Sequence, residues 1–182
     1  GRGSYGNPVT AARRFRWVLL AAVPSSLLLG VTAYLTADVA AHPLLWMPPL
    51  ALYLLSFILV FSRLPGRAAG RIHDFFSPQM RSSVDWLLDG RRLWTLAVPL
   101  LVLILLYLML SGAPLGIGWL LAMHLTVFFA VCMVCHGELA GDRPATDRLT
   151  EYYFWLAAGG ALGGVFNAVV APLTFDAVVE YP

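Results

Sequence analysis

The chain has 182 residues, of which 59% are hydrophobic and only 12% are charged, and its mean hydropathy is +0.75. Ordinary soluble domains carry about 25% charged residues, so a soluble fold of this length could not cover so much apolar surface. The net charge of +2 is too small to indicate a nucleic-acid partner. The composition therefore predicts an integral membrane protein that is surrounded by a lipid bilayer.

Five apolar segments are candidates to cross the bilayer, which takes about 20 residues in a helix. None contains an arginine beyond its first few residues, and a tryptophan lies near an end of each, as is typical of the membrane interface. The predicted spans are residues 15–36, 44–61, 93–111, 117–136 and 152–172. We therefore predict an all-α bundle of about five transmembrane helices, with an N-terminal segment 1–14 and a long loop 62–92.

All twelve cationic side chains are arginines, and in this five-span model they lie on one side of the membrane. Four lie at the start of the first span, six between the second and third spans, and two between the fourth and fifth. Positive side chains are retained on the cytoplasmic side. We therefore predict a bacterial inner-membrane protein with a cytoplasmic N-terminus and an outward-facing C-terminus. A four-span model would divide the arginines between the two sides.

The ends of the chain suggest that it is part of a longer protein. It begins without an initiator methionine, and only a short outward-facing tail, residues 173–182, follows the fifth span. An odd number of spans with so short a tail predicts that the natural protein continues beyond Pro182.

The loop 62–92 contains the pattern of a short cytoplasmic amphipathic helix. Ser77 and Pro78 suit a helix start and Gly90 suits a helix end. The apolar residues between them recur at helical spacing: Met80, Val84, Leu87 and Leu88. Such a helix lies on the membrane surface or against a partner protein. The alternative is a lid packed on the cytoplasmic face of the domain itself.

Cys132, Cys135 and His136 form the C-x-x-C-H pattern of covalent c-type haem attachment. That attachment takes place on the outer side of the membrane, whereas the predicted orientation puts His136 at the cytoplasmic end of the fourth span. A helix also presents two thiols poorly to one porphyrin edge. We therefore expect two free thiols here, rather than a haem, a metal site or a catalytic site.

Three polar residues at membrane depth are the candidate functional residues, since unpaired polar groups are costly in lipid. They are Asp38, His124 and Asn167, all near the outer side in the predicted topology. They could converge on an outward-facing polar pocket, or His124 could bind a cofactor such as a pigment or a metal ion. The alternative is ordinary hydrogen bonding between helices.

Charged side chains also gather at the cytoplasmic end of the fourth span. His136 and Glu138 lie there, and Arg143 and Arg148 follow in the next connection. We expect these four residues to form a structural salt-bridge cluster.

The fifth span carries two interlaced G-x-x-x-G pairs, formed by Gly159, Gly160, Gly163 and Gly164. Small residues at this spacing allow another helix to approach backbone to backbone. The segment is not a nucleotide-binding loop, because it lies within a span and no strand precedes it. We predict tight helix packing against a helix of this chain or of another protein.

Four stretches carry a resemblance to a known family: residues 24–32 (PSSLLLGVT), 43–61, 135–140 (CHGELA) and 159–172. Together they resemble the membrane region of bacterial spermidine synthase-like proteins, which are fused transporter-like and synthase proteins. In that family a soluble aminopropyltransferase-type domain follows the membrane helices. This sequence contains no glycine-rich nucleotide turn after a strand and no acidic cluster for a polyamine. The family's catalytic residues therefore have no positions here.

Two functions from different classes remain. The first is a non-catalytic accessory or scaffold subunit, packed in a larger respiratory or photosynthetic membrane complex through residues 159–164 or 80–88. The second is a membrane anchor or substrate-passing domain for an attached aminopropyltransferase-type enzyme. That function predicts a water-accessible cavity reaching His124, Asn167 or Asp38.

Overall fold

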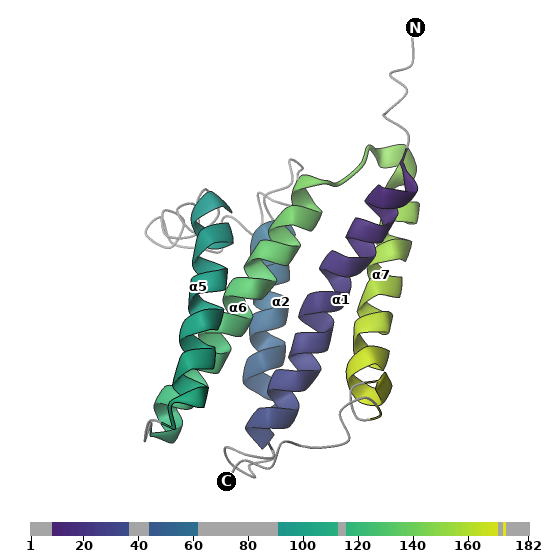
Figure 1. The fold of residues 1–182 in the computed structure, drawn as a ribbon. Coiled ribbons are helices and arrows are strands. Elements are labelled where there is room, and N and C mark those ends of the chain that lie inside the picture. The colour runs from purple at the N-terminus through teal and green to yellow at the C-terminus, as the bar shows by residue number, and fades with distance from the viewer. Residues whose placement is uncertain (1–8, 37–43, 62–90, 113–115, 171–172, 174–182) are drawn as a thin grey trace, which may run out of the picture.

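The computed structural model describes residues 9–36, 44–61, 91–112, 116–170 and 173, and all regular structure within them is helical. Within this part of the chain, five α-helices run alternately up and down (Figure 1). They are α1 (Ala11–Tyr34), α2 (Met47–Phe61), α5 (Arg91–Leu110), α6 (Ile117–Gly141) and α7 (Leu149–Val165). A short 3-10 turn, η2 (Thr146–Arg148), precedes α7, and a π-helical segment, η3 (Phe166–Val170), follows it. The predicted all-helical bundle is confirmed for this part of the chain.

Each predicted span overlaps one of these helices, but α1, α5, α6 and α7 each extend beyond one end of the predicted span, and the helices differ in length. Three segments are long and apolar enough to cross a membrane: Ala11–Tyr34, Ile117–Gly141 and Thr146–Val170. The apolar helices Met47–Phe61 and Ala97–Leu110 are shorter. Only 17%, 22% and 11% of the three long apolar segments is buried in the bundle, which suits lipid surroundings. Membrane crossing by all five helices remains a prediction.

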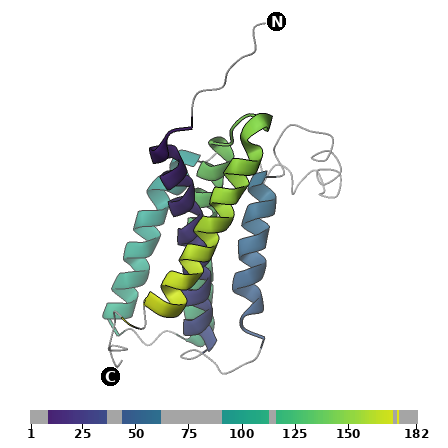
Figure 2. The same ribbon diagram turned by 90° about the vertical axis from the view of Figure 1, so that its right-hand side faces the viewer.

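The helix α6 occupies a central position. It packs against α1, α2 and α5, while α1 makes its most extensive contact with α7. Figure 1 accordingly places α5 and α7 at opposite edges of the bundle. Turned by 90°, the molecule shows α2 and α5 on opposite sides of the α1, α6 and α7 group (Figure 2). The contact between α1 and α7 therefore joins the first and the last α-helix of the described part of the chain.

Two clusters of buried side chains hold the helices together. One joins α1, α6 and α7 and consists of Val9, Trp17, Ala21, Leu139 and Tyr152. The other joins α2 to α6 and consists of Leu59, Val60 and Met133. In the first cluster the ring of Trp17 meets that of Tyr152 edge to face, with centroids 5.0 Å apart. Trp17 thus lies in the core, although its place near a span end predicted a position at the membrane interface.

The two ends of the bundle differ in charge. Every arginine and carboxylate among the described residues lies where α1, α5 and α7 begin and α6 ends, and we name this the charged end. The up-and-down order of the helices therefore collects these charges as the arginine pattern predicted. Asp38 and the predicted amphipathic helix at residues 80–88 lie outside the described residues.

Candidate functional site

Asp142, the C-terminal cap of α6, is the centre of a polar network at the charged end. Its Oδ1 lies 2.9 Å from Arg13 Nε, and its carbonyl oxygen accepts from Arg13 Nη2 at 2.8 Å. The indole N–H of Trp17 donates to Asp142 Oδ2 at 2.7 Å. Nearby, the Tyr152 hydroxyl donates to the Leu139 carbonyl oxygen at 2.8 Å. These bonds satisfy the polar groups of the core and join α1 and α7 to α6.

Two further ion pairs attach α1 to its neighbours. Arg14 Nε lies 2.6 Å from Glu151 Oε1 on α7, and Arg16 pairs with Glu138 on α6. Both pairs are partly exposed, so solvent screening limits what each contributes to stability. Their effect is to hold the start of α1 between α6 and α7.

A salt-bridge network does lie at this end of α6, but of the four residues expected to form it only Glu138 takes part. Glu138 pairs with an arginine of α1, where we expected Arg143 and Arg148. Arg143 lies over the ring of Tyr153 at 5.9 Å, and Arg148 Nε lies 3.9 Å from Asp147 Oδ2. Closeness in the sequence suggested the wrong cations, because the α1 arginines approach only when the bundle is assembled.

His136 lies in the interface between α2 and α6 rather than in the charged network. Its Nδ1 is 2.9 Å from Ser56 Oγ, and that hydroxyl donates its own proton to the Tyr53 carbonyl oxygen at 2.7 Å. The Ser56 hydroxyl therefore connects the imidazole of His136 on α6 with the backbone of α2. The rings of Tyr53 and Phe57 meet the imidazole edge to face at 5.1 and 5.2 Å. His136 is 1% exposed. Its contacts with Ser56, Tyr53 and Phe57 therefore stabilise the interface between α2 and α6.

Cys132 and Cys135 are free thiols, and both are buried. A porphyrin edge could reach the two sulfur atoms only by displacing the helices packed around them. The described residues contain no group of three His, Cys, Asp or Glu side chains that could hold a metal ion. The burial of both thiols therefore indicates that the C-x-x-C-H segment takes part in helix packing.

His124 and Asn167 contact α1 at different levels. The His124 ring stacks on Tyr34 with centroids 4.6 Å apart, and its Nδ1 lies 2.8 Å from the Leu120 carbonyl oxygen. Asn167 Nδ2 donates to the carbonyl oxygen and the hydroxyl of Ser26, at 3.0 and 3.3 Å. Tyr34 and Ser26 are eight residues apart on α1, or about 12 Å along the axis. These contacts therefore join helices and do not bring the two side chains together.

The glycine motif of α7 packs against α1 of the same chain. A Cβ added at Gly159 would lie 2.5 Å from the Val18 carbonyl oxygen and 2.9 Å from Ala21 Cβ. A Cβ at Gly163 would overlap the Ala22 carbonyl oxygen. The other two glycines of the motif meet only side chains, at 3.3 Å or more. The partner helix that the sequence left open is thus α1.

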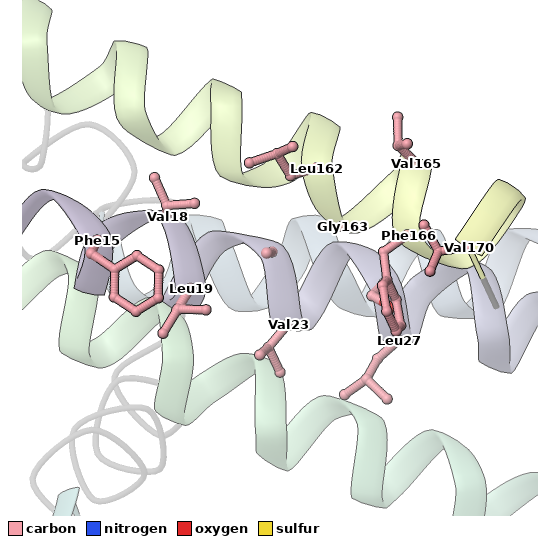
Figure 3. Close-up of a pocket in the computed structure, with 12 residues that line it drawn as sticks. Phe15, Val18, Leu19, Val23, Leu27, Leu162, Gly163, Val165, Phe166 and Val170 are labelled. Atoms are coloured by element: carbon pink, nitrogen blue, oxygen red, sulfur yellow. The ribbon is translucent and has the colours of Figure 1, made fainter. Parts of the chain in front are cut away.

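An apolar groove of about 650 Å³ lies beside this contact (Figure 3). It is lined by α1 and by the α7–η3 segment, and Ser26 is the one polar side chain among its lining residues. Neither His124 nor Asn167 lines it. The groove is therefore suited to hydrocarbon rather than to a polar substrate.

Comparison of this chain with protein-family models, with curated proteins and with solved structures gives no match. The resemblance to spermidine synthase-like membrane regions remains a prediction from the residues. Among the described residues, every buried side-chain nitrogen and oxygen has a hydrogen-bond partner. The arrangement is thus a helix bundle whose interior polar groups bind one another.

Proposed function

We propose that this chain is a non-catalytic membrane helix bundle of the spermidine synthase-like type, which serves as an accessory or scaffold subunit in a larger membrane complex. The observation that carries the proposal is the contrast between surface and interior. Each described α-helix exposes large apolar side chains, those of α6 in its first turn only, whereas the buried polar atoms of the described residues are satisfied within the chain. Ligand sites direct a few polar groups toward their ligand, and here those groups join helices.

In this proposal the bundle lies in a bacterial cytoplasmic membrane. Its charged end faces the cytoplasm, because arginines are retained on that side, and the C-terminus faces outward. The complex is a respiratory or photosynthetic one, in which small apolar subunits fill space between larger ones. Its protein partners contact the apolar surfaces that the bundle leaves exposed.

The rival proposal is an anchor that passes a small polar substrate to an attached aminopropyltransferase-type enzyme. That function needs a polar route between helices toward His124 or Asn167. The apolar lining of the groove and the interhelical bonds of both residues favour the scaffold instead.

The test is native electrophoresis and native mass spectrometry of the tagged protein after extraction from its own membrane in mild detergent. We expect the chain in an assembly much larger than its own mass. A photo-crosslinking residue at the exposed Tyr107 of α5 should join the chain to another subunit of that assembly. The same residue at the buried Leu59 is the control and should react only within the chain.

Two results would overturn the scaffold proposal. One is a protein that migrates alone. The other is a continuous polypeptide whose soluble domain transfers aminopropyl groups, since this would support the anchor.

A further inference from the structure

The groove between α1 and α7 has a length that distinguishes between possible occupants. Along α1 its lining runs from Phe15 through Leu19 and Val23 to Leu27, on one face of the helix (Figure 3). The twelve helical steps from Phe15 to Leu27 span about 18 Å. The hydrocarbon core of a bilayer is about 30 Å thick, so one leaflet is about 15 Å deep. A membrane-crossing helix of another protein would need a contact surface about as long as the whole hydrocarbon core. The length of the groove instead matches the depth of one leaflet.

The lining of the groove offers no free polar group to which an occupant could hydrogen-bond. Its walls are aliphatic and aromatic side chains, and its floor is formed where Gly163 meets α1. The hydroxyl of Ser26, the one polar group in the lining, already accepts from Asn167 Nδ2 at 3.3 Å. An occupant at this depth therefore makes only van der Waals contacts with the lining, because lipid chains and apolar side chains are equally apolar.

An ion pair between α1 and α7 lies next to the Phe15 end of the groove. Arg14 precedes Phe15, the first lining residue, and its ion pair with Glu151 crosses from α1 to α7 at the charged end. The two side chains are 41% and 32% exposed, so each can still interact with a group outside the protein. One cationic and one anionic group side by side complement a headgroup that contains a phosphate and an ammonium. A purely anionic headgroup would meet the Glu151 carboxylate unfavourably.

We propose that the α1–α7 groove binds one acyl chain of an ethanolamine phospholipid from the leaflet at the charged end. The phosphate lies beside Arg14 and the ammonium beside Glu151. This inference rests on the membrane placement in the proposed function, but it does not depend on any protein partner. The bound lipid covers the apolar side of the contact between α1 and α7.

The test places the intact protein in bilayers that contain equal amounts of phosphatidylethanolamine and phosphatidylglycerol with identical acyl chains. After extraction in mild detergent, native mass spectrometry counts the phospholipids retained per protein. We expect one retained phosphatidylethanolamine. Val23→Trp fills the groove and should lower the occupancy roughly tenfold, whereas Leu103→Trp, on an exposed position of α5, is the matched control and should leave it unchanged. Glu151→Gln should abolish the preference between the two headgroups.

Several results would overturn the inference: no retained phospholipid, unchanged occupancy in Val23→Trp, or a preference that survives Glu151→Gln. Crosslinking of groove residues to a helix of another polypeptide would also overturn it. Alkaline carbonate extraction of the same membranes separates this failure from that of the proposed function. Protein that stays in the membrane without bound lipid contradicts only the groove inference, whereas protein released by carbonate contradicts the membrane placement itself.

Discussion

Gly159 of α7 lies so close to Val18 of α1 that a Cβ at this glycine would stand 2.5 Å from the Val18 carbonyl oxygen. Because that oxygen belongs to a helix backbone, it cannot move aside as a flexible side chain can. Gly164, five residues further along the same helix, differs: its added Cβ would meet only Leu29 Cδ1, at 3.9 Å. Substitutions at these two glycines therefore distinguish the effect of close contact between helices from the effect of intrinsic helix preference.

Gly159→Ala should lower the free energy of unfolding by about 1–3 kcal/mol, as overpacking of a well-packed contact does. Gly164→Ala should leave it unchanged or raise it by up to about 1 kcal/mol, because alanine favours a helix more than glycine does. Circular dichroism during reversible unfolding in mixed micelles measures both. Equal effects of the two substitutions would show that α7 does not pack on α1 in this register.

Ser56→Ala should destabilise the contact between α2 and α6. It leaves the Nδ1 atom of His136 buried without its hydrogen-bond partner, which costs about 1–3 kcal/mol. Ser111→Ala is the matched control, because the Ser111 hydroxyl bonds only to the Leu108 carbonyl oxygen and is exposed. The same unfolding measurement checks both variants. A loss no larger than that of the control would contradict the bond between Ser56 and His136.

Asp142→Ala should be more disruptive than Asp142→Asn. The alanine removes the carboxylate that accepts from the Trp17 indole and from Arg13 Nε, and hydrogen bonds to a charged group contribute about 1.5–3 kcal/mol each. The asparagine keeps one oxygen in place and should cause a smaller loss. Asp147→Ala serves as the control, with a change below about 1 kcal/mol, because its 3.9 Å pair with Arg148 is exposed. Thermal unfolding followed by tryptophan fluorescence ranks the three, and the reverse order would disprove the network.

Labelling of single added cysteines tests the orientation. Thr146 is exposed at the charged end and Ser111 is exposed at the opposite end of the bundle. In intact cells, a membrane-impermeant maleimide should modify Ser111→Cys but not Thr146→Cys, and both should react after lysis. The two native cysteines are buried, so the unmodified protein supplies the background. Labelling of Thr146→Cys alone in intact cells would invert the proposed topology.

The course of the chain could be predicted because hydropathy and charge are local properties of the sequence. Apolar length located each helix of the bundle, and the arginine pattern grouped the ends of those helices correctly. The spacing of Gly159 and Gly163 likewise predicted a close helix contact. Each of these features needs no knowledge of which helix stands beside which.

The specific partners could not be predicted, for a related physical reason. The helices α6 and α7 are apolar around most of their circumference. The sequence therefore does not indicate which face of either helix is buried in the bundle. The pairing of Glu138 with Arg16 and the burial of Trp17 depend on how α1 is rotated in the bundle. Ser56 was missed although a hydroxyl inside an apolar helix already signals a need for a partner. Asn167 and His124 share the outer half of the sequence model but bind α1 about two turns apart.

The ion pair between Arg14 and Glu151 also bears on the order of assembly during synthesis. The two residues are 137 positions apart, which corresponds to about 7–27 s at about 5–20 residues per second on the ribosome. During that interval α1 exists without α7, and Arg14 has only water or lipid headgroups as partners. Helix α1 is therefore made well before its ion pair with α7 can fix it in place. A ribosome that stalls before α7 emerges leaves an open bundle for the quality-control machinery of the cell.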